Sequence, residues 1–311
     1  MIETEVVLDE RLFTVNCAFN LCGCDQKSKG KYETARKKIK KEIQEKKIKN
    51  KKQICEKINK YPVSHLKSFS SYLSNPPEFK LEKEPPGVTD FMKEIYDDIK
   101  GIEKQLRIIY KQAELSKIWK ENQETYQKCK KDFENSIDKY KPVKRLTDFL
   151  EIDSSFKKIN CIPSVLEGMS IGVPITEHKA NMIISIPWRN NNVEYSFGLT
   201  HELTHLLLKP VIRENKELIQ QSSWRRKEAP DNYYYQSWKV YLEETLARVI
   251  GLHIYHSNEK RRKRRIKHLK EKQGFTHAEL ISREIKKYEE TDETFDEFLP
   301  KILRKLAEGK K

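Results

Sequence analysis

The sequence lacks any apolar run long enough to cross a membrane. Its longest apolar runs, such as Met182–Ile186 and Leu206–Leu208, fall far short of the roughly 20 residues that a transmembrane helix needs. Residues 1–12 carry acidic side chains where a secretory signal carries basic ones, and no apolar core follows them. We therefore predict a protein without a membrane span and a cytoplasmic location.

The six cysteines lack a recognisable metal-binding pattern. Only Cys17, Cys22 and Cys24 lie close together, and their spacing matches no zinc knuckle. In the absence of an export signal we expect all six cysteines to be reduced. Because apolar residues such as Val15 and Phe19 surround the three close cysteines, we predict buried free thiols rather than metal ligands.

Basic and acidic residues are not balanced in number. Lys and Arg number 62 against 47 Asp and Glu, which gives a net charge of +15 at pH 7. This surplus favours contact with an anionic partner, although it also serves solubility. The 14 Tyr, 12 Phe and 4 Trp are enough to build a core, so a disordered chain is excluded. The length of 311 residues corresponds to one large domain or two small ones.

Helical periodicity and proline positions divide the chain near residue 87. Isoleucines recur at helical intervals between Tyr32 and Asn59, which predicts an N-terminal helical segment with a solvated lysine-rich face. The prolines at positions 76, 77, 85 and 86 are incompatible with a continuous helix. We therefore predict an N-terminal helical region of residues 1–87 and a second region of residues 88–311.

The second region combines helices with the only predicted sheet. A period of 3.6 residues between Val88 and Tyr140 predicts two helices. Short apolar runs separated by turn residues predict three strands, at Ile159–Val165, Met169–Ile175 and Met182–Ile186. A helix is expected from Val193 to Leu208, ending at Pro210. The expected fold class is α+β, mostly helical, with a small mixed β-sheet that precedes this last helix.

The helix at 193–208 contains an HExxH pattern formed by His201, Glu202 and His205. Two histidines four residues apart differ by about 40° around a helix axis, so both imidazoles can reach one metal ion. Glu202 lies beside them, where it can act on a water coordinated to that ion. The side chains expected to bury the opposite side of the helix are Leu199, Leu203, Leu206 and Leu207. The pattern predicts a metal centre with zinc as its natural occupant.

A catalytic zinc usually takes three protein ligands and keeps one position open, so a third ligand is required. Periodicity predicts a second helix from Gln236 to His256, with the adjacent acids Glu243 and Glu244 near its centre. Because the two acids face different sides of the helix and neither side is clearly the buried one, periodicity alone does not separate them. Either acid can supply the third ligand.

These residues resemble a known group of enzymes. The HExxH helix followed by a helical glutamate resembles the gluzincin zinc metallopeptidases, and residues 201–210 (HELTHLLLKP) resemble an uncharacterised gluzincin-like family with the motif HEFxHxxxNP. That family has a downstream glutamate four residues before an arginine, which matches Glu244 and Arg248. The resemblance extends to residues 8–23 and 119–133 and so covers most of the chain. This sequence departs from the motif at Lys209, where the family usually has Asn.

The resemblance implies a zincin-like fold, one zinc ion per chain and a specific ligand set. His201, His205 and Glu244 are the implied ligands, and Glu202 is the implied general base. The implied function is that of a zinc metallopeptidase, which hydrolyses peptide bonds of a peptide or protein substrate with a metal-activated water. Such a reaction also needs a donor to the developing oxyanion.

Several residues qualify as that oxyanion donor. Tyr241 and Arg248 are the catalytic candidates that we name, although Arg248 can instead hold Glu244 in place. Other candidates on the same stretch are Tyr233, Tyr234, Tyr235, His253 and His256. We hypothesise that the strand at 180–186, just before the active helix, is a free sheet edge to which an extended peptide substrate adds as another strand.

Six consecutive cations, Lys260–Arg265, open a basic C-terminal helical tail that begins at about residue 260. Such a run can bind phosphates or act as a nuclear address, but no aromatic residues or groove-reading motif accompany it, so a solvated helix face is the simpler interpretation. Two alternatives to the peptidase remain. One is an inactive metal-bound scaffold, and the other is a non-enzymatic basic protein that binds nucleic acid or an anionic surface.

Overall fold

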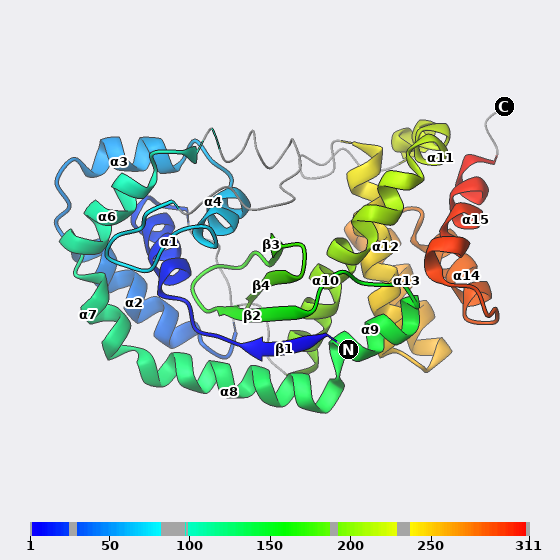
Figure 1. The fold of residues 1–311 in the computed structure, drawn as a ribbon, viewed down its shortest axis with the longest axis horizontal. Coiled ribbons are helices and arrows are strands. Elements are labelled where there is room, and N and C mark those ends of the chain that lie inside the picture. The colour runs from blue at the N-terminus through cyan, green and yellow to red at the C-terminus, as the bar shows by residue number, and fades with distance from the viewer. Residues whose placement is uncertain are drawn as a thin grey trace. The chain divides into compact units, whose positions relative to one another are not determined.

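The computed structural model describes residues 2–24, 30–81, 97, 99–186, 192–228 and 237–308 (Figure 1). The chain forms two compact units. Unit 1 comprises Met1–Lys141 and Ser155–Leu199, and unit 2 comprises Pro142–Ser154 and Thr200–Lys311. The boundary predicted between residues 87 and 88 lies outside the described residues. Helices that precede and follow it in the sequence pack together within unit 1.

Unit 1 contains seven described helices and a sheet. The helices are α1 (Glu10–Leu21), α2 (Glu33–Glu45), α3 (Lys51–Ile58), α4 (Val63–Ser70), α6 (Glu103–Gln112), α7 (Leu115–Glu121) and α8 (Gln123–Tyr140). Helices α2 and α3 agree with the predicted N-terminal helical segment. The prediction of two helices between 88 and 140 is wrong for its described part, which holds three. Glu114 adopts a left-handed backbone conformation with φ of 53° and separates α6 from α7.

The sheet is small and mixed. Its strands are β1 (Glu3–Val6), β2 (Lys158–Ser164), β3 (Ile171–Thr176) and β4 (Lys179–Ser185), in the order β1-β2-β4-β3. The pairs β1–β2 and β2–β4 are parallel, and β3–β4 is antiparallel. The α+β class and the three predicted strands are therefore confirmed.

Two details of the sheet differ from the sequence prediction. Strand β4 pairs with both β2 and β3, so the expected free edge at 180–186 does not exist and no peptide can add there. Strand β1 was not expected, because its four residues alternate acidic and neutral side chains. Lys158 of the neighbouring strand lies 3.5 Å from Glu3 and 2.8 Å from Glu5, which compensates the two acids.

Helix α1 is the central element of unit 1. Asp9 caps it by accepting hydrogen bonds from the backbone N–H groups of Arg11 and Leu12, at 2.8 and 3.2 Å. Every residue from Leu12 to Leu21 is buried, and α2, α4 and α6 pack around it. Leu12 also packs in one apolar cluster with Ile162 and Ile183, which joins the helix to the sheet.

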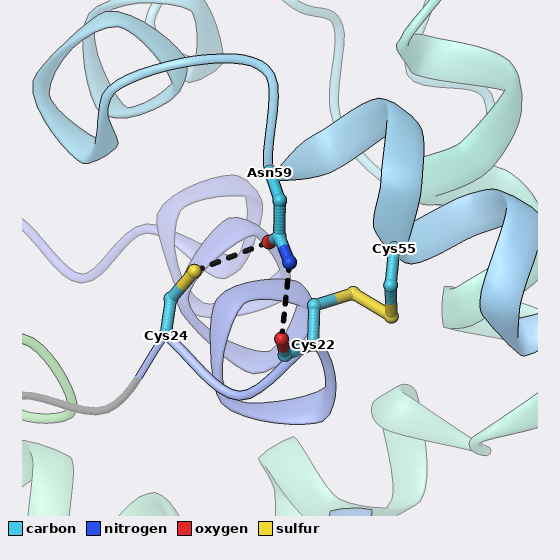
Figure 2. The surroundings of a disulfide bond; sticks show 4 residues. All are labelled: Cys22, Cys24, Cys55 and Asn59. Atoms are coloured by element: carbon cyan, nitrogen blue, oxygen red, sulfur yellow. Dashed lines mark hydrogen bonds between the residues drawn. A yellow bond between two sulfur atoms is a disulfide. The ribbon is translucent and has the colours of Figure 1, made fainter.

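A disulfide links Cys22, just after α1, to Cys55 in α3 (Figure 2). The expectation that all cysteines are free is therefore wrong for this pair. The two residues are 33 positions apart in sequence, and only the packing of α1 against α3 brings their Cα atoms to 5.0 Å. Cys17 is a buried free thiol as predicted. Cys24 is free but only partly buried, and its Sγ donates to Oδ1 of Asn59 at 3.1 Å.

Unit 2 is helical in its described residues. It contains α9 (Pro142–Leu150), α11 (Lys216–Gln221), the 3-10 helix η1 (Ser223–Glu228), α12 (Trp238–Tyr255), α13 (Glu259–Gln273), α14 (Ala278–Tyr288) and α15 (Phe295–Ala307). Helix α12 contacts α9, α13, α14 and η1, so it forms the centre of the unit. The predicted basic tail is thus a set of helices packed into unit 2. None of the helices in the described residues combines the length and apolar character needed to span a bilayer.

Helix α10 (Asn192–Glu214) begins in unit 1 and continues into unit 2. Its predicted end at Pro210 is wrong, because the helix continues for four more residues. Pro210 cannot donate a backbone hydrogen bond, which normally destabilises a helix interior. Val211 and Ile212 directly after it are 4% and 2% exposed, so their burial compensates that loss.

Candidate metal centre

Helix α10 positions the two histidines on a face that remains partly open. The side chains of His201 and His205 are 14% and 22% exposed. The predicted core side is confirmed, because Leu199, Leu203, Leu206 and Leu207 are all buried. The two imidazole centroids lie 4.8 Å apart with the rings at 90°. This arrangement follows from the four-residue spacing on one helix.

Glu244 of α12 completes a triangle with the two histidines. The Nε2 atoms of His201 and His205 lie 3.3 Å apart. Oε1 of Glu244 lies 3.3 Å from Nε2 of His201, and its Oε2 lies 3.2 Å from Nε2 of His205. One ligand atom from each residue can be chosen so that all three lie within 4.8 Å of one another. Three possible ligands from two helices therefore converge.

The triangle has the dimensions of a zinc ligand set. With bonds of about 2.0–2.1 Å, a tetrahedral zinc ion places neighbouring ligand atoms about 3.3–3.4 Å apart. The Nε2–Nε2 separation of 3.3 Å agrees with this edge length, and each of the two nitrogens lies 3.2–3.3 Å from a different oxygen of Glu244. Two imidazole nitrogens and one carboxylate are also the donor types that catalytic zinc takes. The residues present fit a zinc ion.

The structure distinguishes the two adjacent acids. Glu244 faces both histidines, whereas Glu243 makes no hydrogen bond or ion pair with any described residue. Helix α12 therefore directs Glu244 toward the histidines. The choice that periodicity left open depends on which face of α12 lies toward α10.

Arg248 lies one turn after Glu244 and holds its carboxylate. Nη2 of Arg248 donates to Oε1 of Glu244 at 2.5 Å. The guanidinium also lies 4.8 Å from the ring centroid of Phe275, a contact that fixes its plane. Arg248 therefore lies where it can hold the Glu244 carboxylate in place, which is the alternative to a role as oxyanion donor. Phe275 was not anticipated, because it follows α13 and no periodicity relates it to the motif.

Local charges set the protonation of the two acids in opposite directions. Desolvation acts to raise the pKa of Glu244, but His201, His205 and Arg248 hold that pKa well below its usual range. Desolvation raises the pKa of Glu243 above its ordinary value. For His205, desolvation acts to lower the pKa, and hydrogen bonding to Glu244 raises it overall. The low pKa of Glu244 keeps its side chain a carboxylate, the form that binds metal.

Glu202 is a carboxylate without a partner among the described residues. It is only partly exposed, and no hydrogen bond or ion pair joins it to them. Its charge acts on both His205 and Lys209, so it lies close to the metal-ligand candidates. A general base needs a free acceptor oxygen near the metal centre, and Glu202 provides one.

The other predicted donors lie in different surroundings. The hydroxyl of Tyr241 is within hydrogen-bond distance of Gly274 O and Thr276 Oγ1, at 3.3 and 3.1 Å, so these contacts join α12 to the segment after α13. His253 is bonded to Glu289 at 2.8 Å and to Ser282 at 2.9 Å. Neither residue is brought to the His–Glu triangle by these contacts.

The remaining predicted donors are the three tyrosines and His256. Tyr233, Tyr234 and Tyr235 lie outside the described residues. His256 follows α12, and desolvation together with the arginines at 261, 262 and 265 lowers its pKa.

One feature of the centre departs from common zinc sites. Nδ1 of His201 is buried and has no hydrogen-bond partner among the described residues. Metal-bound histidines usually donate their second N–H group to an acceptor.

No family model, no curated protein and no solved structure matches the chain. The geometry of the His201–His205–Glu244 cluster is therefore what indicates a function for this chain.

Proposed function

We propose that the protein is a zinc-dependent metallopeptidase of the gluzincin type, with a zincin-like catalytic region. The observation that carries the proposal is the convergence of His201, His205 and Glu244. The two Nε2 atoms lie 3.3 Å apart and each lies 3.2–3.3 Å from one Glu244 oxygen, which suits a tetrahedral zinc ion. Three ligands leave a fourth position for water, which distinguishes a catalytic from a structural site. One ion per chain is expected.

The residues of the chain have distinct tasks in this proposal. A zinc ion in such a site supplies Lewis acidity to a water molecule and to a peptide carbonyl. Glu202 accepts the proton of the attacking water and returns it to the departing amine. Arg248 keeps the Glu244 carboxylate oriented and ionised. A catalytic role for Tyr241 or for Arg248 at the oxyanion stays a prediction.

Metal content tests the centre directly. We expect elemental analysis to find one zinc per chain in the wild type and none in His205→Ala or Glu244→Ala. Glu243→Ala is the matched control, since it removes the adjacent carboxylate of the same helix and should retain zinc. A wild-type protein that stays metal-free when zinc is supplied contradicts the proposal. Equal zinc loss in both glutamate variants contradicts the assignment of Glu244.

A second candidate function comes from helix α13. Five cations of this helix are exposed and have no ion pair with any described residue, namely Lys260, Arg261, Arg264, Arg265 and Lys272. Arg264, Arg265 and Lys272 follow Arg261 by 3, 4 and 11 residues, which places these four cations on one face. By contrast, Arg262 lies 3.9 Å from Glu289, and Lys263 lies 3.0 Å from Glu259. We call Arg261, Arg264, Arg265 and Lys272 the α13 stripe.

The chemistry of the α13 stripe favours a duplex nucleic acid bound through its phosphates. The apolar residues of α13, Ile266 and Leu269, are buried, so the helix has no free apolar face to insert into a membrane. It carries no Phe, Tyr or Trp on which single-stranded bases stack. Three guanidinium groups can each bind a phosphate through two hydrogen bonds. We propose sequence-independent contact with the phosphate backbone.

A charge-matched pair of variants tests the α13 stripe. Arg261→Glu/Arg264→Glu/Arg265→Glu removes three of its cations, and Lys38→Glu/Lys52→Glu/Lys57→Glu makes the same charge change on α2 and α3. We expect only the first to weaken binding to a short DNA duplex, and to lower the slope of log affinity against log salt by roughly 3. Equal weakening by both variants, or preferential binding to vesicles of anionic lipid, contradicts the proposal.

A further inference from the structure

A cleft of about 300 Å³ lies within unit 2, beyond the metal centre along α10 and α12. Its walls come from α10, α11, η1 and α12. The lining residues are Ile212, Arg213, Lys216, Ile219, Gln220, Ser223, Trp238 and Lys239. We call this feature the cationic cleft. None of the eight residues belongs to the sequence motifs.

The cationic cleft lies about two helical turns from the metal-ligand candidates along α10. Ile212 follows His205 by seven residues, which corresponds to two turns on the same face and about 10 Å along α10. Lys239 precedes Glu244 by five residues, about 7.5 Å along α12. Both helices that carry the proposed metal ligands therefore also carry the cleft. Lys209 lies one turn after His205, between the metal-ligand candidates and the cleft along α10. It interacts electrostatically with Glu202 and Glu243.

The floor and the rim of the cationic cleft differ in chemistry. Ile212, Ile219 and Trp238 are 2%, 6% and 5% exposed and form an apolar floor. The indole N–H of Trp238 already donates to Ser222 Oγ at 2.9 Å, so its polar group is satisfied. The rim carries exposed cations, and no acidic side chain of the described residues lines the cleft.

The rim cations are available to a ligand. Arg213, Lys216 and Lys239 form no ion pair with any described residue. Glu243, one turn after Lys239, interacts with it electrostatically but does not line the cleft. Three cations without an ion pair to any described residue, around an apolar floor, complement a group that is both apolar and negatively charged. In a peptide, that combination is an apolar side chain next to a carboxylate. The carboxylate belongs either to an acidic residue or to the end of the chain.

We propose that the cationic cleft is a specificity subsite of the metal centre, which accepts an apolar residue accompanied by a carboxylate. The inference rests on the proposed peptidase function. An extended peptide advances about 3.3 Å per residue, so a separation of about 10 Å corresponds to three residues from the bond that is cleaved. Arg213, Lys216 and Lys239 are the specificity residues, and Ile212, Ile219 and Trp238 form the apolar contact.

Binding measured without turnover tests this subsite. The probes are fluorescent peptides that contain Phe next to Glu, the same peptides with Gln in place of Glu, and both forms with an amidated C-terminus. They are titrated by fluorescence anisotropy into the Glu202→Gln protein, whose ligands for zinc are intact. We expect the peptide with a carboxylate beside Phe to bind about 10-fold or more tightly than its neutral analogue. The amidated pair identifies which carboxylate is bound.

Rim variants link that preference to the cleft. Arg213→Glu/Lys216→Glu, made in the same Glu202→Gln background, should abolish the preference for the carboxylate. Both positions are exposed, so folding should persist. The control Lys260→Glu/Arg304→Glu changes the charge of unit 2 equally at other exposed positions and should retain the preference. A Trp238→Ala variant should weaken both peptides alike.

The outcomes separate this inference from the proposed function. Equal affinity for charged and neutral peptides overturns the subsite, as does an equal loss of preference in the rim and control variants. Failure of the peptidase proposal has a different signature, namely no zinc and no peptide hydrolysis in the wild type. The binding preference is measured independently of both.

Discussion

Two clusters of polar side chains in this protein differ in how they are bonded. In unit 1, Asn16, Asn20, Lys67, Ser164 and Glu167 are each at most 2% exposed. In unit 2, the side chains of His201, His205 and Glu244 are 14–22% exposed. The first cluster is sealed in the core, and the second can be reached from solvent.

The hydrogen bonds of the two clusters explain the difference. In the sealed cluster, the amide of Asn16 donates to Ser164 at 3.1 Å, that of Asn20 to Glu167 at 3.2 Å, and Lys67 to the carbonyl of Met169 at 2.9 Å. The Oδ1 atoms of Asn16 and Asn20 are buried and have no hydrogen-bond partner among the described residues. In the open cluster, two imidazole nitrogens and a carboxylate turn toward one another. Buried donors that meet acceptors stabilise a fold, whereas imidazole nitrogens that converge with a carboxylate suit a cation.

The largest effect is expected at the open cluster. Glu202→Gln removes the proposed base but keeps the size of the side chain, so peptide hydrolysis should fall about 10²–10⁴-fold. Elemental analysis should find the zinc content unchanged, because Glu202 is not a proposed ligand. Hydrolysis that persists at the wild-type rate rules out Glu202 as the base.

In the sealed cluster we expect a substitution to lower stability without changing zinc content. Lys67→Met keeps the volume of the side chain but removes the ammonium from a fully buried site, which should lower the free energy of unfolding by about 3–5 kcal/mol. Chemical denaturation measures the loss. Zinc content should be unaffected. A variant as stable as the wild type shows that the buried ammonium is not needed, and the comparison between the two clusters then fails.

Arg248 tests how much the open cluster depends on its support. Arg248→Gln removes the bond to Glu244 without touching a proposed ligand, so zinc affinity should fall about 10–100-fold. Competition with a chromogenic chelator measures the affinity. Arg248→Lys should restore only part of it, because a lysine does not reproduce the planar contact with Phe275. Unchanged affinity in Arg248→Gln removes the positioning role.

The smallest effect is expected at a partly exposed ion pair of unit 1. Asp132 in unit 1 accepts a hydrogen bond from Tyr32 at 2.6 Å and is paired with Lys31. Desolvation acts to raise the pKa of Asp132, but hydrogen bonds from Lys31 and Tyr32 lower it overall. A lowered pKa in the folded state means that the ionised carboxylate stabilises the protein above its unfolded pKa, near 3.8, and that this contribution is lost as the pH falls further.

Asp132→Asn should therefore lower the free energy of unfolding by about 1–2 kcal/mol at neutral pH. Denaturation of both proteins across the acidic range measures the difference, which should shrink below about pH 4 as the wild-type carboxyl becomes protonated. A difference that stays constant with pH excludes an ionised Asp132 as its source.

Much of the candidate site could be predicted from local sequence. The spacing of His201 and His205 on one helix determines their relative positions, because a helix repeats every 3.6 residues. The leucines of the same helix were correctly assigned to the core. The three strands β2 to β4 were also found, since short apolar runs between turn residues are typical of buried strands. These features depend on neighbours within a few residues.

The wrong predictions share one cause, which is dependence on distant parts of the chain. The free edge at 180–186 was wrong because strand order is set by pairing between β4 and two other strands. The helix end at Pro210 was wrong because burial of Val211 and Ile212 outweighs a lost hydrogen bond. The Cys22–Cys55 disulfide was missed because it joins residues brought together by helix packing.

The sequence by itself determined the helix that carries His201, Glu202 and His205, the α+β class and the basic character of residues 260–265. Only the tertiary structure decided that Glu244 rather than Glu243 faces the histidines, that Arg248 lies behind it, and that Arg261, Arg264, Arg265 and Lys272 of α13 have no ion pair with any described residue. It also decided that α10, α11, η1 and α12 enclose the cationic cleft. Local periodicity states which residues share a side of a helix, but packing against other helices selects the side that faces the site.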